Sequence, residues 1–322
     1  MIANLEILAD RPAIYAFVVV LGLLFGSFAN VCIYRWPPSD AYPDGQSVVL
    51  PGSHCFACET PIQWYDNTPL LSWLWLRGRC RSCKAAFSPR YLFVEALTGM
   101  LFGAAWWFAT RTTLFYEPFD VRLIRFGVYA AFIFVLVVIA FIDLDHKLIL
   151  DKITYPCIPL FYGLGLLLPE RHWVDGLVGA AFGYGFIWLI SKTYFLVTKR
   201  EGLGLGDAKL LALVGALLGW PGVLVALFGG SMIGSVIGLG LIASGRKLSS
   251  GDGDGDGDGG GDDDDGGDDL EPAPASPSAS DPPARPSVLK AELPFGPFLV
   301  TGALFYLFAA DWIHLKFLLL GN

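Results

Sequence analysis

Charged residues are scarce in this sequence of 322 residues: they make up 16% of the chain, whereas hydrophobic residues make up 54%. A soluble domain carries about 25% charged and about 45–50% apolar residues. Residues 12–34 contain no charge at all, and residues 210–245 form a second uncharged run. This composition, with a mean hydropathy of +0.54, excludes a soluble globule and a disordered protein for the chain as a whole.

Long apolar runs predict where the chain crosses a membrane. The hydrocarbon core of a bilayer is about 30 Å thick and takes about 20 helical residues to cross. The run 210–245 would be roughly 54 Å long as one helix, and the turn signal at Trp220-Pro221-Gly222 divides it into two expected helices. The sequence therefore predicts an all-α polytopic membrane protein with about eight transmembrane helices, the others at 12–34, 91–110, 126–142, 153–169, 176–191 and 294–310.

Lysine and arginine are unevenly divided between the loops. The loops at 35–90, 143–152, 192–209 and 245–292 together hold 16 Lys and Arg residues, whereas the alternate loops and both termini together hold 6. Loops rich in Lys and Arg stay on the cytoplasmic side of a membrane. We therefore expect the first set of loops in the cytoplasm and both termini outside.

The net charge of -8 comes from one segment. Residues 246–292 hold 13 acidic and 4 basic residues, first in alternating Gly and Asp and then in a run of Pro, Ser and Ala. Such a composition cannot bury a core and is typical of a disordered linker. A calcium-binding repeat is the alternative, but it needs an aliphatic residue at a regular step, and none occurs between Gly251 and Asp269.

Four cysteines form two CxxC pairs, Cys55 with Cys58 and Cys80 with Cys83, and 21 residues separate the pairs. A CxxC turn directs two thiolates at one point, and two such turns complete the tetrahedral four-sulfur shell of structural zinc. Two disulfides are the alternative, which a reducing cytoplasm disfavours. We expect a closed zinc site with no open position for catalysis at the metal.

Other residues around this cluster have lesser expected roles. Three arginines of the same loop would help to keep the thiolates ionised: Arg77, Arg79 and Arg81. His54 adjoins the cluster, but four cysteines already complete the shell, so we expect a bystander. Cys32 and Cys157 lie in apolar runs, where ordinary buried thiols are the default.

Two aspartates lie at the ends of predicted spans, where a charge is costly and usually functional. Asp143 ends the third span, and Asp207 opens the sixth, 64 residues later, behind a glycine-rich run. The predicted topology places both at the cytoplasmic interface. Two carboxylates brought close can serve as general base and general acid on a water molecule. Headgroup contact or helix capping is the structural alternative.

Taken together, these motifs resemble those of the prepilin peptidases, also called type IV leader peptidases. The resemblance covers most of residues 20–320 outside the acidic segment. It rests on the order and spacing of several segments: 26–35 (GSFANVCIYR), the four cysteines, 88–91 with Val94 and Glu95, Asp143 with Asp151, 204–207 (GLGD) and 294–298 (PFGPF). Leu150 and Leu203 depart from the family's usual Pro and Met, and both changes leave the carboxylates in place.

The resemblance implies an intramembrane aspartyl protease of the bacterial inner membrane with its active site facing the cytoplasm. It would remove the basic leader of prepilins and pseudopilins just after a glycine, with Asp143 and Asp207 as the catalytic pair. Many members then N-methylate the new amino terminus, which implies S-adenosylmethionine as a cofactor besides structural zinc. The sequence does not indicate which residues bind this methyl donor. Prepilins, pseudopilins and membrane lipids are the implied partners, and nucleic acid is not one.

The neighbours of the two aspartates are expected to support them: Asp145, His146, Asp151 and Lys209. The predicted organisation has five parts. Residues 1–34 form a first transmembrane helix, 35–90 a cytoplasmic zinc-binding loop domain, 91–245 a transmembrane catalytic core, 246–292 the linker, and 293–322 the last transmembrane helix.

Two other functional classes fit parts of the sequence. A zinc-loop membrane scaffold of a pilus or secretion machine, without peptidase activity, leaves both aspartate motifs unexplained. A transporter with proton-relaying acids usually carries them deep in a span, whereas Asp143 and Asp207 lie at span ends. Glu95 is the best candidate for a buried acid, and we expect it to pair with Arg90 or with another helix.

Overall fold

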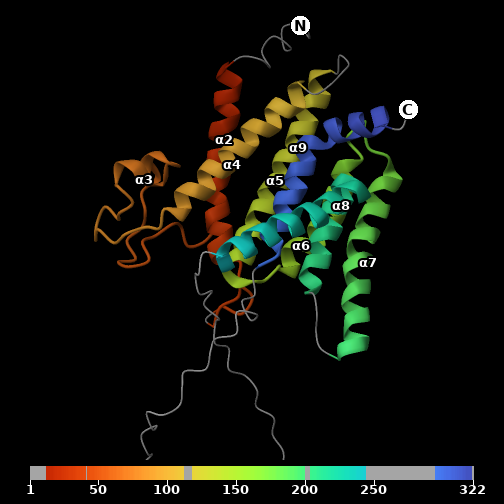
Figure 1. Cartoon of the computed structure of the whole chain (residues 1–322). Coiled ribbons are helices and arrows are strands. Elements are labelled where there is room, and N and C mark those ends of the chain that lie inside the picture. The colour runs from red at the N-terminus through yellow and green to blue at the C-terminus, as the bar shows by residue number, and fades with distance from the viewer. Residues whose placement is uncertain (1–11, 41, 112–117, 200–203, 244–293, 321–322) are drawn as a thin grey trace, which may run out of the picture. The chain divides into compact units, whose positions relative to one another are not determined.

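The computed structural model describes residues 12–40, 42–111, 118–199, 204–243 and 294–320. Every regular element within these residues is helical, and strand-like pairing is limited to isolated bridges in the cysteine-containing loop. The predicted all-α fold is confirmed (Figure 1). The acidic segment 246–292 lies outside the described residues, so its role as a linker stays a prediction.

The helices follow one another along the chain with loops of very different length. The described elements are α2 (Pro12–Arg35), η1 (Trp64–Asn67), α3 (Leu71–Trp75), α4 (Arg90–Arg111), α5 (Phe119–His146), α6 (Asp151–Gly165), α7 (Trp173–Thr198), α8 (Leu205–Ala243) and α9 (Gly296–Leu320). The loop between α2 and α4 contains η1, α3 and all four paired cysteines.

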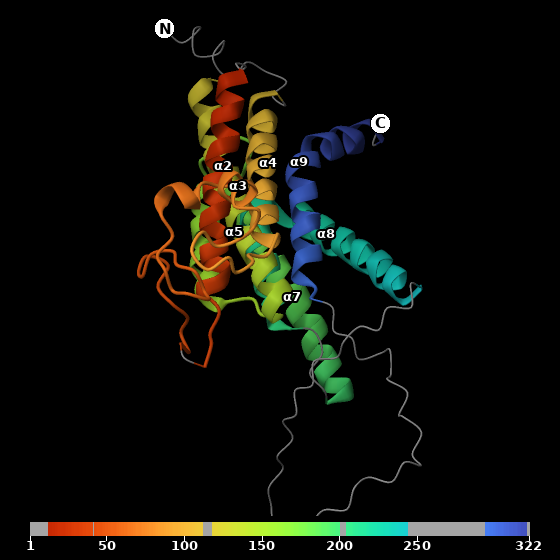
Figure 2. The same ribbon diagram turned by 90° about the vertical axis from the view of Figure 1, so that its left-hand side faces the viewer.

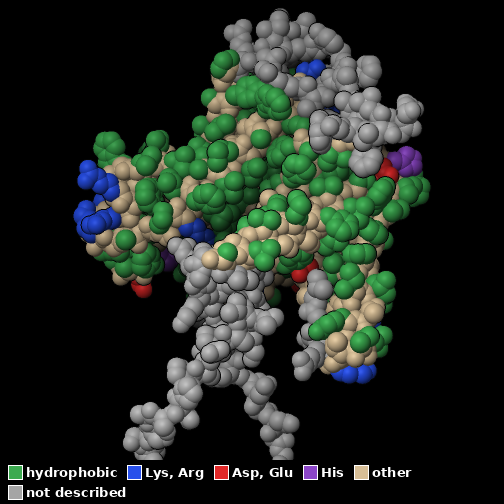
Figure 3. Space-filling model, in the orientation of Figure 1, with side chains coloured by type: hydrophobic (Ala, Val, Ile, Leu, Met, Phe, Trp, Pro, Cys, Tyr) green, Lys and Arg blue, Asp and Glu red, His purple; other side chains and the backbone are tan. Residues whose placement is uncertain are grey.

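Five of the described helices are long and apolar enough to cross a membrane: α2, α4, α5, α7 and α8. Apolar side chains cover much of the surface over these helices (Figure 3). Helix α9 offers a shorter apolar stretch, Gly296–Ala310, and α6 has 15 residues, roughly 22 Å of helix. The chain is therefore a membrane protein with several apolar helices, but the predicted count of eight spans is not confirmed.

Glycines bring α2 and α4 into close contact. A Cβ added to Gly22 would lie 2.8 Å from the Cα of Gly99, and a Cβ added to Gly26 would lie 2.7 Å from the Cα of Glu95. Small residues are the usual means by which membrane helices approach this closely. Helix α5 runs beside this pair (Figure 2) and is largely buried along its length.

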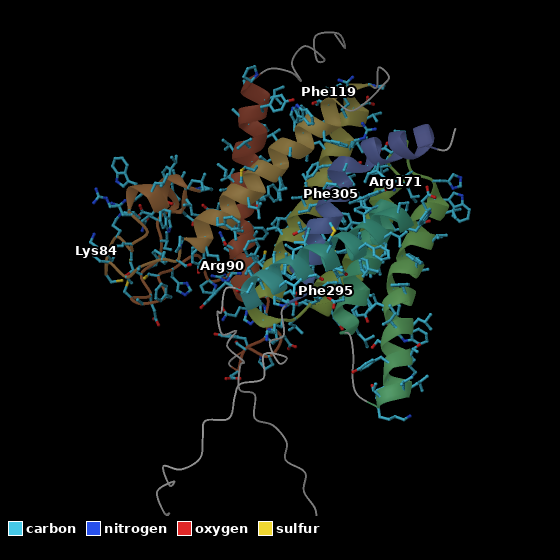
Figure 4. All side chains as sticks on the ribbon, in the orientation of Figure 1. Lys84, Arg90, Phe119, Arg171, Phe295 and Phe305 are labelled. Carbon is cyan, nitrogen blue, oxygen red and sulfur yellow. The ribbon has the colours of Figure 1, made fainter. Side chains whose placement is uncertain are left out.

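Polar contacts show which helix ends lie together. The Nδ2 of Asn30 in α2 donates to the carbonyl of Tyr91 in α4 at 3.1 Å, and the Nη2 of Arg90 donates to the carbonyl of Phe141 in α5 at 3.1 Å. The C-terminal ends of α2 and α5 and the N-terminal end of α4 therefore meet, and we call this the Asp143 end. Figure 4 shows Arg90 near this end and Phe119, the first residue of α5, at the opposite one.

Helix α8 is broken at Gly219, where φ is +74°, a value that glycine adopts without steric cost. Pro221 follows the break and has no backbone N–H to donate. Arg171, from the loop before α7, donates its Nη1 to the carbonyl of Leu218 at 2.8 Å. This contact satisfies a carbonyl that the break leaves without a helical partner. The predicted division of the run 210–245 is confirmed, with the break just before the predicted turn.

The change Gly179→Ala tests the packing of α7 against α8. A Cβ on Gly179 would collide with the carbonyl oxygen of Gly215, and a Cβ on Gly215 would collide with that of Gly179. We expect a loss of about 1–3 kcal/mol of stability from this overpacking, measured as a lower unfolding temperature in detergent.

Gly185→Ala is the matched control in the same helix, because no atom lies within 4 Å of its Cβ position. Replacing this glycine should stabilise the helix by up to about 1 kcal/mol. An equal fall in unfolding temperature for both variants would contradict the contact.

Candidate functional site

Asp143 lies in the last turn of α5 and is only 5% exposed. Its Oδ2 accepts a hydrogen bond from the backbone N–H of Gly296, the first residue of α9, at 2.9 Å. Lys147 ends α5 in the left-handed conformation, and its N–H donates to the carbonyl of Asp143 at 2.8 Å. The carboxylate therefore faces the positive end of a helix dipole, which favours its charge.

Gly296 is a site residue that sequence reasoning missed. A Cβ at this position would lie 2.6 Å from the Oδ2 of Asp143, so only glycine lets the backbone N–H reach the carboxylate. The segment 294–298 enters the sequence analysis as part of the family resemblance, without a role for Gly296. A glycine as the first residue of an apolar helix, between Phe295 and Pro297, was the available signal, because glycine is a poor helix former.

Asp207 lies in the first turn of α8 and is half-buried. Asp143 lies close enough for its charge to act on Asp207, although the two carboxylates are 64 residues apart in sequence. Gly206 lets the start of α8 pack closely against Ile149, since a Cβ on this glycine would lie 3.1 Å from the Cβ of Ile149. The glycine-rich segment before Asp207 thus packs against the loop that follows α5.

Two ion pairs flank the aspartates. Lys209 of α8 binds Asp151 at the start of α6, with 2.5 Å between Nζ and Oδ1. Arg90 of α4 binds Asp145 of α5. Asp145 and Asp151 are thus neutralised, whereas in the described chain no Lys or Arg forms an ion pair with Asp143 or Asp207. His146 is exposed at the end of α5. Three of the four neighbours expected to support the pair thus take part in ion pairs between helices, and their supporting role stays a prediction.

Glu95 bonds to another helix, one of the two expected alternatives, whereas Arg90, the other expected partner, binds Asp145. The Oε2 of Glu95 accepts a hydrogen bond from the backbone N–H of Leu70 at 2.9 Å, and the side chain of Ser27 also bonds to it. Leu70 has a φ of +59°, which is uncommon for a residue with a side chain. This contact fastens the loop before α3 to α4.

The four paired cysteines come together in the loop between α2 and α4, where their sulfur atoms lie within 4.8 Å of one another. The Sγ atoms of Cys55 and Cys83 are 3.7 Å apart, and those of Cys58 and Cys80 are 4.0 Å apart. A tetrahedron of sulfurs at about 2.3 Å from a metal has edges of about 3.8 Å. The thiols therefore have the spacing of a metal centre, and none of the six cysteines forms a disulfide.

Both CxxC turns have the same backbone form. The N–H of Glu59 donates to the carbonyl of Cys55 at 2.9 Å, and the N–H of Lys84 donates to the carbonyl of Cys80 at 3.1 Å. Glu59 and Lys84 both have positive φ, at 55° and 63°. The Nδ1 of His54 lies 3.0 Å from the carbonyl oxygen of Gly52, and its bystander role stays a prediction.

Arg81, one of the three arginines expected to act on the thiolates, instead contacts an acid of the loop. Hydrogen bonds with the side chain and then the backbone of Thr60 lower the pKa of the Cys58 thiol to about 6. Arg81 instead binds Asp66, with 2.5 Å between Nη2 and Oδ1, and this contact lowers the pKa of Asp66. Local hydrogen bonds thus favour the Cys58 thiolate, the form that binds metals.

Two hollows adjoin these residues. A cavity of about 610 Å³, which we call the loop cavity, lies between the cysteine loop and the Asp143 end of α2 and α4. An apolar groove of about 630 Å³ is formed by α4, α5 and α9, with Phe305 of α9 on its wall (Figure 4). Leu144 and Pro297, which line this groove, are each one residue from the hydrogen-bonded pair of Asp143 and Gly296.

Two family profiles match separate parts of the chain. The Bacterial Peptidase A24 N-terminal domain matches residues 20–109, and the Type IV leader peptidase family matches residues 130–239. The four paired cysteines lie in the first region. Asp143 and Asp207 lie in the second.

Relatives named prepilin leader peptidase/N-methyltransferase align with most of the chain. The relative from Aeromonas salmonicida is 36% identical over 263 residues, which is 74% of this chain and 85% of that protein. The relative from Aeromonas hydrophila is 37% identical over 262 residues, which is 74% of this chain and 85% of that protein. The relative from Pseudomonas aeruginosa is 34% identical over 258 residues, which is 73% of this chain and 83% of that protein. No solved structure matches the chain. The resemblance drawn from the motifs is confirmed: the chain belongs to the type IV leader peptidase family.

Proposed function

We propose that this chain is a prepilin leader peptidase that also N-methylates the amino terminus it exposes. The observation that supports peptidase activity is the pair of Asp143 and Asp207 at two helix ends, where the N–H of Gly296 binds Asp143. The relatives' names, which include both activities, support the methyltransferase. A scaffold without peptidase activity leaves this pair and those names unexplained.

Cleavage follows from the two carboxylates. One of them takes a proton from a water molecule while the water oxygen attacks the carbonyl carbon of the scissile bond. The other, protonated at the start, donates its proton to the leaving nitrogen as the C–N bond breaks. The N–H of Gly296 fixes the direction in which Asp143 presents its free lone pairs. No covalent acyl intermediate is needed.

The proposed location is the bacterial inner membrane, with the Asp143 end facing the cytoplasm. The excess of Lys and Arg in the loops at this end supports that orientation. The basic leader of the substrate would then stay in the cytoplasm, and the scissile bond would reach the aspartates at the interface. The division into a first span, loop domain, catalytic core, linker and last span belongs to the same proposal.

The apolar groove suits the membrane-embedded part of such a substrate. Its walls are almost entirely aliphatic and aromatic side chains of α4, α5 and α9. Its position beside Asp143 would let an apolar helix lie in the groove while the residues before it reach the carboxylates. We propose that the hydrophobic segment of prepilin occupies this groove during cleavage.

Zinc is the metal that the four thiols fit best. A shell of four sulfurs at tetrahedral spacing is typical of structural zinc, and it leaves no position open for a substrate. The ion would hold the two CxxC turns together and so shape the loop. The methyl group for the second reaction would come from S-adenosylmethionine.

Replacing either aspartate by asparagine should abolish cleavage, because asparagine cannot exchange a proton with water. We expect Asp143→Asn and Asp207→Asn each to lower the rate of leader removal by a factor of about 10²–10⁴, measured by mass spectrometry of a prepilin substrate. Asp120→Asn is the control, since Asp120 lies in the first turn of α5, far from the pair. Normal cleavage by either active-site variant would refute the peptidase mechanism.

Filling the apolar groove with a larger side chain should weaken prepilin binding and leave the rate of bond cleavage unchanged. Ala140 lines the groove on α5, and we expect Ala140→Trp to raise the KM for full-length prepilin about tenfold. Cleavage of a short soluble leader peptide should stay unchanged. Ala131→Trp changes an exposed residue of the same helix outside the groove and serves as the control. Equal KM changes in the two variants would exclude the groove as the substrate site.

Removing one thiol should remove the metal. We expect the purified protein to hold about one zinc ion per chain and Cys58→Ser to lose most of it, measured by inductively coupled plasma mass spectrometry. Cys157→Ser is the matched control, because Cys157 lies in α6 outside the cluster. Another metal in stoichiometric amount, or zinc retained by the Cys58 variant, would contradict the assignment.

A further inference from the structure

The end of the molecule opposite the Asp143 end brings together basic side chains from two separate parts of the chain. Arg125 of α5 binds Glu170 of the loop before α7, with 3.0 Å from Nε to Oε1 and 3.0 Å from Nη2 to Oε2. Arg122 lies three residues before Arg125, on the same side of α5, and Arg171 directly follows Glu170. We call Arg122, Arg125 and Arg171 the arginine cluster. Figure 4 shows Arg171 in the upper part of the molecule, away from the Asp143 end.

Two of these guanidinium groups have donors that the described chain does not satisfy. The Nε atoms of Arg122 and Arg171 are buried and have no hydrogen-bond partner among the described residues. Neither side chain forms an ion pair with an acid of those residues. Arg171 donates its Nη1 to the carbonyl of Leu218, which leaves its other donors available. A charged donor that is buried without an acceptor is costly, and an anion beside both side chains would remove this cost.

The acids near the cluster already have other roles. Glu170 is bound on both carboxylate oxygens by Arg125. The Oδ2 of Asp175 accepts a backbone N–H at 3.2 Å in the capping box of α7. Asp120 is exposed in the first turn of α5, where its charge favours the helix dipole. The first and third arginines of the cluster therefore lack an anionic partner within the described chain.

Exposed apolar side chains flank the cluster. Leu123 and Ile124 directly follow its first arginine in α5 and are 49% and 41% exposed. Leu167 and Trp173 lie on either side of its third arginine in sequence, and both are 57% exposed. Tryptophan is enriched where membrane proteins meet the headgroup level, and leucine suits the hydrocarbon beneath it. Basic groups beside exposed apolar side chains match the two parts of a phospholipid, whereas a free anion would leave the apolar part unused.

We propose that the arginine cluster binds the phosphate headgroup of an anionic phospholipid from the membrane leaflet at this end. Arg122 and Arg171 donate to the phosphate oxygens, because the guanidinium fork matches the geometry of phosphate. Arg125 keeps its bond to Glu170 and so fixes α5 against the loop that carries Arg171. The acyl chains lie along the exposed leucines of α5 and of the loop before α7. The site is separate from the aspartate pair, and its existence does not depend on peptidase activity.

A bound headgroup would also act on the break in α8. The Nη1 of Arg171 bonds to the carbonyl of Leu218, directly before the break at Gly219. A phosphate that restrains this arginine would therefore restrain the break as well. The lipid would join three parts of the chain at this end: the start of α5, the loop before α7 and the middle of α8.

The test measures binding of dioleoyl phosphatidylglycerol to the full-length protein, delipidated in a neutral detergent, by native mass spectrometry. We expect this lipid to bind about tenfold more tightly than dioleoyl phosphatidylcholine, whose choline group cancels the charge of the phosphate. Arg122→Gln should raise the Kd for phosphatidylglycerol about tenfold. Arg122→Lys keeps the charge but loses the fork, so its Kd should fall between the two. Lys84→Gln removes an equal charge from an exposed position of the cysteine loop and should leave the Kd unchanged.

A phosphatidylglycerol with a photoreactive diazirine in its acyl chain gives the position of binding. Labelled peptides should come from residues 119–125 and 166–177. The unfolding temperature without added lipid checks the fold of each variant, and Arg122→Lys carries the same comparison if Arg122→Gln does not fold.

Three results would overturn the proposal. The first is equal affinity for the two lipids, and the second is an equal change of Kd in the Arg122 and Lys84 variants. The third is displacement of the lipid by millimolar inorganic phosphate, which would identify the ligand as a free anion. Label confined to other segments would likewise exclude the arginine cluster as the site.

Discussion

One hydrogen bond, from the backbone N–H of Gly296 to the carboxylate of Asp143, joins segments that are 153 residues apart and sets the position of the candidate active site. It requires a glycine at the start of α9, because any Cβ there would strike the carboxylate. It also requires α5 to end where it does, which the left-handed Lys147 ensures. The last helix is therefore part of the site, although it lies outside both regions that the family profiles match.

Two functional parts meet at the N-terminal end of α4. On one side, Glu95 and Tyr91 line the loop cavity, and Glu95 holds the cysteine loop to α4 through the N–H of Leu70. On the other, Arg90 binds Asp145 and the carbonyl of Phe141 beside the aspartate pair. The first two turns of α4 therefore contact both parts.

The features that could be predicted from the sequence depend on the spacing of residues within a short motif. The features that could not be predicted depend on contacts with backbone groups far away in the sequence. The two CxxC pairs and the helix break near Gly219 follow from short motifs whose geometry is carried within a few residues. The juxtaposition of the two aspartates was expected from their matching positions at span ends. The hydrogen bond between Gly296 and Asp143 forms only in the complete tertiary fold. The same holds for the hydrogen bond from the N–H of Leu70 to Glu95, because residue propensities do not predict the positive φ of Leu70.

The break in α8 has a further consequence for the surrounding lipid. The first half of that helix, residues 205–218, is roughly 21 Å long, and α6 is roughly 22 Å long, so both fall short of a hydrocarbon core of about 30 Å. A bilayer accommodates short apolar helices by becoming locally thinner. Headgroups and water would then lie closer to Asp207 than in an undisturbed membrane. Hydrolysis of a bond at the membrane surface consumes water, and a thinned bilayer beside α6 and α8 would supply it.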